Sequence, residues 1–116
     1  MSIERFQPGP RMSQAVKSAG VVYLAGQVAQ RAADAPVSEQ TADILARIDE
    51  LLAEAGTDKS KALAATIWLT DIATFDEMNE VWNGWIDPAN PPARACVEAK
   101  LASPKFNVEI MVTAAV

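Results

Sequence analysis

The sequence predicts an α+β fold in which two helices cover one face of a mixed sheet of about six strands. Two segments carry apolar residues at helical spacing, and several shorter segments are β-branched or alternate in polarity. The length of 116 residues suits one domain. Because no internal repeat, low-complexity tract or linker interrupts the chain, residues 1–116 are expected to form that single domain.

The first two strands should form a hairpin. Segments 12–17 and 21–25 have extended character, and Ser18-Ala19-Gly20 between them is typical of a short hairpin turn. We therefore expect the two strands to pair antiparallel.

The first helix is the most strongly patterned element. It should span residues 38–55, with Ser38 as N-cap and Gly56 just past its end. Its apolar positions recur at helical spacing and are Ile44, Leu45, Ile48, Leu51, Leu52 and Ala55. Segment 62–69 then has the bulk and β-branching of a buried strand. A strand, a helix and a strand in this order predict two parallel strands joined by a right-handed crossover.

A second helix and two more strands complete the chain. Thr74 and Glu77 fit a capping box at the start of the helix, and Asp87-Pro88 should end it. Its apolar face is formed by Phe75, Met78, Val81, Trp82 and Trp85, with both tryptophans expected in the core. Segments 94–99 and 107–115 alternate in polarity, so Arg94 and Cys96 should share one strand face, while Glu109 lies on a face of the last strand.

Two of the strands are apolar on both faces, which has a consequence for assembly. The sequences are Val21-Val22-Tyr23-Leu24 and Ile67-Trp68-Leu69. Two helices can cover only one face of a sheet, so the other face should meet another subunit. A longer loop that shields this face is the alternative.

Composition excludes several classes of function. Ten basic and fifteen acidic residues give a net charge of −5, which provides no general attraction for nucleic acid or an anionic membrane. The single cysteine cannot form an intrachain disulfide, and neither a signal peptide nor a membrane span is recognisable, so a cytoplasmic location is expected. Histidine is absent, which removes serine triads, histidine bases and the commonest zinc sites. The scattered glycines form no phosphate loop, so we expect neither a metal nor a nucleotide cofactor.

The segment Pro92-Ala93-Arg94-Ala95-Cys96-Val97-Glu98 resembles the RidA/YjgF family of reactive-intermediate deaminases. Segments 24–28, 40–41, 50–56, 68–71, 75–79 and 108–110 agree in order and spacing, so the resemblance covers nearly the whole chain. It implies a chorismate-mutase-like α+β fold and a homotrimer whose sheets line a central barrel, with three sites in clefts between subunits. It also implies cofactor-independent hydrolysis of 2-imino or 2-enamino acids, such as those formed from 2-aminoacrylate, to 2-oxo acids and ammonia.

Arg94 and Glu109 are the expected catalytic residues. A guanidinium can hold the substrate carboxylate through two parallel hydrogen bonds and so fix the imine carbon for water. Arg94 suits this role, although a surface arginine paired with an acid is the structural alternative. Glu109 could orient or deprotonate the attacking water and pass a proton to the leaving nitrogen. Its alternative is an ordinary interface carboxylate.

Further candidates would line the substrate pocket. Cys96 is expected to be a wall of the pocket and not a nucleophile, because the chain lacks a histidine to activate it. The resemblance places Asn79 near the site, although an exposed helix position is equally compatible. Gly26 could allow close backbone approach to the ligand or mark a bulge. Met12 and Ala25 stand where the best-known deaminases carry tyrosine and serine, so the substrate range should shift, towards bulkier or more apolar side chains.

Two other functions stay open at the sequence level. One is a pathway-specific hydrolase of an aminomuconate or aminoacrylate derivative. The other is a ligand sensor or protective binding protein in which Arg94 captures a carboxylate but no water is activated. Some relatives are reported as ribonucleases, but net acidity and the lack of histidine argue against that activity here.

Overall fold

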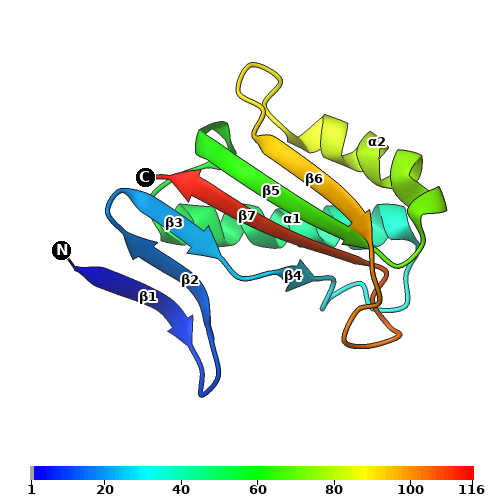
Figure 1. Cartoon of the computed structure of the whole chain (residues 1–116), viewed down its shortest axis with the longest axis horizontal. Coiled ribbons are helices and arrows are strands. Elements are labelled where there is room, and N and C mark those ends of the chain that lie inside the picture. Colours follow the sequence, from blue (N-terminus) through cyan, green and yellow to red (C-terminus); the bar gives the residue numbers. More distant parts are fainter. Residues whose placement is uncertain (1) are drawn as a thin grey trace.

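A seven-stranded sheet with two helices on one face forms the molecule (Figure 1). The computed structural model describes residues 2–116. The strands are β1 (Ile3–Pro8), β2 (Ser13–Ser18), β3 (Val21–Leu24), β4 (Gln27–Val28), β5 (Ala62–Leu69), β6 (Ala93–Glu98) and β7 (Val108–Ala115). The helices are α1 (Val37–Glu54) and α2 (Phe75–Trp85). A short 3-10 turn at Lys59–Lys61 lies between α1 and β5, and another at Ile72–Thr74 directly precedes α2.

The strand order is β1-β2-β3-β7-β5-β6, with β4 paired to β7. β3 and β5 are both antiparallel to β7, which lies between them, so they run in the same direction as predicted without being neighbours. The adjacent parallel pair is β5 with β6, and α2 lies in the connection between those two strands. The hairpin of β2 and β3 is confirmed. Its two turn residues, Ala19 and Gly20, both have positive φ (53° and 79°), as a type I′ turn requires.

Helix α1 ends as predicted but begins differently. Gly56 has φ of 86°, and the N–H of Thr57 donates to the carbonyl of Leu52 (2.9 Å), which is a Schellman motif. The predicted cap at Ser38 is wrong, because the N-cap position is Pro36 and Ser38 lies within the first turn. The free N–H of Ser38 is satisfied instead by the Glu77 carboxylate of α2, at 2.9 Å.

The predicted capping box of α2 is also wrong, although the helix starts where expected. Thr74 follows a 3-10 turn and has φ −88° and ψ 8°, which is not the extended backbone of a side-chain cap. Its hydroxyl donates to the Asp71 carbonyl (2.6 Å), and Glu77 is engaged with Ser38. The glutamate therefore ties the two helices together.

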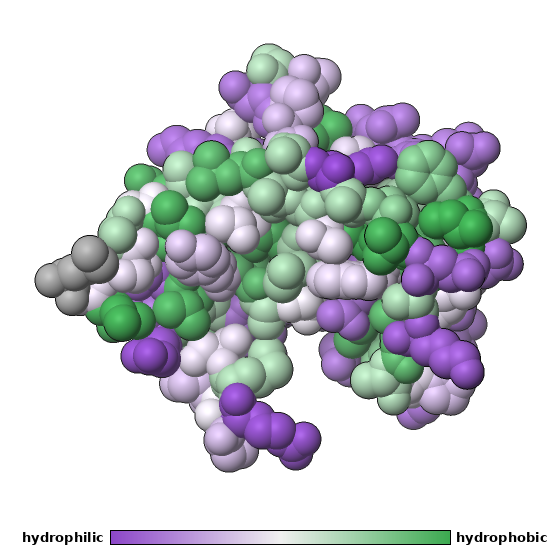
Figure 2. Space-filling view, in the orientation of Figure 1, coloured by the Kyte–Doolittle hydropathy of each residue, from purple (hydrophilic) through white to green (hydrophobic). Residues whose placement is uncertain are grey.

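The two faces of the sheet differ in cover. Alternate residues of β5 and β7 pack under the helices and are buried: Ala65, Ile67, Leu69, Val108, Ile110, Val112 and Ala114. On the other face Tyr23, Val97 and Met111 are 53%, 46% and 39% exposed. Figure 2 looks onto this face and shows pale and green atoms over its centre, with purple atoms mostly at the rim. Within residues 2–116 nothing covers it, so the longer shielding loop that was the alternative is not present in this part of the chain.

Two strands were not predicted. β1 pairs with β2 at one end of the sheet, and β4 is only two residues long. β3 and β4 lie one after the other along β7, and the chain between them, at Ala25 and Gly26, leaves the sheet ladder. Neither α1 nor α2 is long and apolar enough to cross a membrane.

Candidate functional site

Arg94 lies on β6 and is directed towards α2. It pairs with Ala65 of β5, whose side chain is buried under the helices, so the two side chains share that face. The Arg94 Nη1 donates to Oδ1 of Asn79 at 2.7 Å. The guanidinium carbon lies 5.1 Å from the centre of the Trp82 ring and 5.8 Å from that of Phe75. Two aromatic faces and one amide therefore hold the guanidinium in place.

No carboxylate neutralises Arg94. In the part of the chain that the structure describes, the one ion pair joins Arg31 to Glu50. Arg94 is also an exposed residue. Its remaining N–H donors are thus accessible, and the alternative of a surface arginine paired with an acid is not what this subunit contains.

Cys96 follows Arg94 on the same strand face and is half-buried. Burial raises the pKa of its thiol, while the positive charge of Arg94 acts weakly in the opposite direction. A thiol that is neutral at physiological pH is a poor nucleophile, which agrees with its expected place in a pocket wall.

Glu109 lies on β7 and packs against Gly26. A β-carbon added to Gly26 would overlap the Glu109 carboxylate, so glycine at this position lets the Glu109 side chain keep its place without moving. Burial raises the pKa of the Glu109 carboxyl, and within residues 2–116 no side chain or backbone N–H donates to it. The result is a partly desolvated acid without a fixed partner, which suits a proton-transfer role.

A single subunit does not bring Arg94 and Glu109 together. Arg94 pairs with Ala65, whereas Glu109 pairs with Trp68, three positions further along β5. Because strand side chains alternate between faces, an odd separation places the two residues on opposite faces of the sheet. Asn79 and Cys96 accompany Arg94, whereas Gly26 accompanies Glu109.

A cavity of about 310 Å³ adjoins the Gly26 side of this arrangement. Figure 2 shows the hollow at the lower edge of the molecule, between the turn of the β1–β2 hairpin and the loops beyond β4. Its lining comes from the start of β2, from residues 26–31 around β4 and from α1, and comprises Met12, Gln14, Gly26, Gln27, Val28, Gln30, Arg31, Asp43 and Arg47. Met12 and Gly26 are thus brought to one cavity, as candidates of the same pocket should be.

The family model described as "Endoribonuclease L-PSP" matches residues 2–116. The chain belongs to this family. It is 41% identical over 114 residues to a RutC family protein of Haemophilus influenzae, covering 98% of each chain. It is 40% identical over 116 residues to the RutC family protein YoaB of Escherichia coli K12, covering 100% of each.

Solved structures of the L-PSP/YjgF group share the fold. A YjgF family member from Neisseria meningitidis is 47% identical, with a TM-score of 0.95 over 99% of this chain and 95% of the other. A YjgF/YER057c/UK114 family member from Mycobacterium tuberculosis is 29% identical, with a TM-score of 0.88 over 99% and 100% of the two chains. These matches confirm the predicted RidA/YjgF resemblance and the chorismate-mutase-like α+β fold.

In this L-PSP family chain, the structure groups several further residues with the candidates, and none of them was predicted as a site residue. Trp82 was expected only in the core, and it is indeed 6% exposed, yet its ring also faces Arg94. Gln27 and Arg47 line the cavity from elements some twenty residues apart; Arg47 belongs to no motif, and Gln27 lies in the matched segment 24–28 but was not predicted as a site residue. Helical or strand periodicity marks burial and cannot mark such convergence.

Proposed function

We propose that this protein hydrolyses 2-imino and 2-enamino acids, such as those derived from 2-aminoacrylate, to 2-oxo acids and ammonia without a cofactor. The observation that carries the proposal is the seated and uncompensated guanidinium of Arg94. A substrate of this class always carries a carboxylate next to the reacting carbon. An arginine that is oriented but not neutralised is the group best suited to bind it.

Arg94 would bind both carboxylate oxygens with the N–H donors that Asn79 does not use. This contact fixes the neighbouring imine carbon and converts attack by water into a reaction of bound partners. Charge on the guanidinium also offsets negative charge near the reacting carbon as the addition proceeds.

Glu109 would act as the general base and then as the general acid of the reaction. Its carboxylate accepts a proton from water as the oxygen bonds to the imine carbon and the C=N electron pair moves to nitrogen, and the protonated carboxyl then passes this proton to that nitrogen. The resulting tetrahedral carbinolamine loses ammonia as the C=O bond forms, and Glu109 accepts the hydroxyl proton and delivers it to the leaving nitrogen. A carboxyl whose pKa is raised by burial is better matched to this exchange near neutrality than an ordinary glutamate.

The site would be completed by a second subunit. Arg94 and Glu109 lie on opposite faces of the sheet in one chain, so they meet only if Glu109 comes from a neighbouring copy. The uncovered apolar face, with Tyr23, Val97 and Met111, supports self-association, and the family resemblance favours a homotrimer with three such clefts.

The deciding test measures release of 2-oxo acids from imines generated in situ by an amino-acid oxidase. Wild-type protein should accelerate release, and Arg94→Ala should lower kcat/KM by about 100-fold or more, because the reacting carbon loses its anchor. Arg5→Ala is the matched control, since Arg5 is an exposed arginine on β1 outside the proposed site. Absence of acceleration with every imine, or equal losses in the two variants, would refute the proposal.

Two alternatives give different results. A sensor or binding protein that captures a carboxylate without activating water would retain ligand binding in both the wild type and Glu109→Gln, with no hydrolysis by either. The family description names an endoribonuclease, and RNA cleavage abolished by Arg94→Ala would favour that activity. We expect no such cleavage, because a net charge of −5 opposes RNA binding.

A further inference from the structure

The cavity beside Gly26 has a polar wall that the reaction described above does not use. Met12 and Val28 are its apolar members, whereas most of the remaining lining is amide or charged. Such a lining does not match the bulky apolar side chain that Met12 alone favours. Two of its groups, Gln27 and Arg47, are placed to make specific hydrogen bonds.

Gln27 presents an unused acceptor. The residue is only 6% exposed. Its Nε2 donates to Oε1 of Gln14 (2.9 Å) and to the carbonyl of Ala25 (3.1 Å), so the orientation of the amide is fixed. Its Oε1 accepts no hydrogen bond from the described chain. Every side-chain oxygen of the described residues that is fully shielded from solvent has a hydrogen-bond partner, so the Gln27 Oε1 is not fully shielded. This oxygen is therefore open to the cavity that Gln27 lines, and it can accept a hydrogen bond from a ligand.

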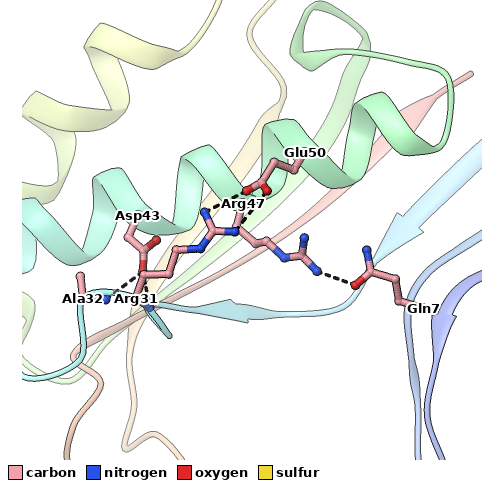
Figure 3. Close-up of polar contacts among 6 residues, drawn as sticks. All are labelled: Gln7, Arg31, Ala32, Asp43, Arg47 and Glu50. Atoms are coloured by element: carbon pink, nitrogen blue, oxygen red, sulfur yellow. Dashed lines mark hydrogen bonds and ion pairs between the residues drawn. The ribbon is translucent and has the colours of Figure 1, made fainter.

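Arg47 presents unused donors. It is half-buried on α1, and Nη2 donates to Oε1 of Gln7 at 2.7 Å. Gln7 is itself held by Glu54, through a hydrogen bond of 2.7 Å from Nε2 to the carboxylate. Figure 3 shows Gln7 at the end of the Arg47 side chain. The guanidinium is thus anchored by a neutral amide and keeps its charge and its other N–H groups.

The other charged groups of the cavity are already engaged. Arg31 pairs with Glu50 through Nη1 (3.0 Å) and Nη2 (3.1 Å), on the same side of α1 (Figure 3). The Asp43 carboxylate accepts from the backbone N–H groups of Arg31 and Ala32, at 3.0 and 3.1 Å. Among the lining groups, Gln27 is the buried amide with an open acceptor and Arg47 is the guanidinium without an ion pair, and the amides of Gln14 and Gln30 also line the wall.

We propose that this cavity holds the side chain of the substrate and selects 2-imino acids whose side chain ends in a carboxamide. The amide carbonyl would accept from Arg47, and the amide N–H would donate to Gln27. A carboxylate side chain could satisfy only Arg47, and an aliphatic one would satisfy neither.

The place of the cavity supports this assignment, which rests on the proposed function. Gly26 belongs to the cavity lining and also contacts the Glu109 carboxylate, so one residue separates the cavity from the proposed proton-transfer group. A substrate whose imine carbon lies at Glu109 can extend its side chain past Gly26 without meeting a β-carbon.

The test compares imines of glutamine, glutamate and leucine, generated by the same oxidase. The wild type should have its highest kcat/KM with the glutamine imine. Gln27→Leu and Arg47→Met should each lower that value by about tenfold or more and change the leucine value by less than about twofold. Arg5→Met, outside the cavity, is the control. An equal loss for all three imines, or a wild-type preference for leucine, would overturn the proposal.

Stability and binding separate this proposal from the function on which it rests. Gln27 is buried, so its variant must be shown to fold by circular dichroism, whereas Arg47 is only half-buried and provides a second variant. If no imine is hydrolysed, the proposed function fails, and calorimetry with L-glutamine, a stable amino acid with the same carboxamide side chain, still tests the cavity. Binding that weakens by about tenfold in Arg47→Met supports the pocket, and equal binding in both proteins overturns it.

Discussion

Asn79 is the neutral neighbour on which the availability of Arg94 depends. It accepts a hydrogen bond of 2.7 Å from the guanidinium without cancelling its charge. Asn79→Asp keeps the shape and adds the carboxylate that Arg94 lacks, so the substrate carboxylate must compete with an ion pair. We expect KM for imino acids to rise by about tenfold, with little loss of folding stability.

Steady-state kinetics on Asn79→Asp and on Asn83→Asp checks this expectation. Asn83 is an exposed residue of the same helix, so its variant adds the same charge away from Arg94. A KM that is unchanged in Asn79→Asp, or that rises equally in both variants, would show that Arg94 does not bind the substrate carboxylate.

The raised pKa of Glu109 predicts a pH dependence of the folding stability. Burial raises its pKa in the folded state, so the folded protein binds this proton more tightly than the unfolded chain does. The stability that Glu109 contributes is therefore fully present below the ordinary glutamate pKa and is lost as pH rises through the folded value. Glu109→Gln removes this loss, so its urea midpoint relative to wild type should rise with pH. A constant difference between the two proteins would contradict the raised pKa.

The same shift predicts the pH dependence of catalysis. Glu109 must be ionised to accept a proton from water, so kcat/KM should fall on the acidic side with a pKa above that of an ordinary glutamate. A pH–rate profile without such a limb would remove Glu109 from the proton-transfer role.

At the scale of elements, Gln40 joins helix α1 to the loop before β7. It is fully buried, and Nε2 donates to the carbonyls of Ala35 (3.0 Å) and Lys105 (3.1 Å), while Oε1 accepts from the N–H of Asn107 (2.8 Å). Gln40→Leu has similar volume but leaves the Ala35 carbonyl and the Asn107 N–H without these partners, and the Lys105 carbonyl keeps only the hydrogen bond from the Asp34 N–H (3.0 Å). We expect a loss of about 3 kcal/mol or more in the free energy of unfolding.

Urea denaturation of Gln40→Leu, compared with Glu39→Leu, measures this loss. Glu39 is the adjacent exposed residue of the same helix, and its variant should change stability by about 0.5 kcal/mol at most. A comparably small effect at Gln40 would mean that the loop does not depend on this contact.

Elements with strong internal patterns were predictable, and elements defined by their partners were not. Helix α1 and strand β5 carry dense apolar periodicity, and β5 matches its expected range of 62–69. Strand β1 contains a proline, charged residues and little alternation, and it forms because β2 offers a free edge. The helix caps failed for a related reason, because Glu77 bonds across to the other helix.

The candidate site was predictable only as far as a resemblance reached. Arg94, Asn79 and Gly26 came from matched segments, and the structure adds their contacts. Arg47 lies outside the matched segments, and Gln27 lies within segment 24–28 but was not predicted as a site residue, because the role of both depends on how α1 and β4 meet around the cavity. A spatial arrangement of this kind has no counterpart in local spacing.

The strand register of the sheet determines which residues of the proposed site one subunit can bring together. Arg94 and Glu109 are fixed on opposite faces by strand register, so no side-chain rotation within a subunit can unite them. The open apolar face offers the surface through which another copy can approach. Light scattering on the eluting protein should therefore give three times the mass of one chain. A monomer would contradict the shared site.

Subunit complementation tests the shared site directly. Arg94→Ala and Glu109→Gln should each be inactive alone, because every cleft then lacks one of its two groups. If the proteins are mixed in equal amounts, unfolded in urea and refolded together, each cleft draws Arg94 from one subunit and Glu109 from another at random. About a quarter of the clefts then contain both native residues, so about a quarter of wild-type activity should return. A site contained within one subunit would recover nothing, since no chain in the mixture carries both residues.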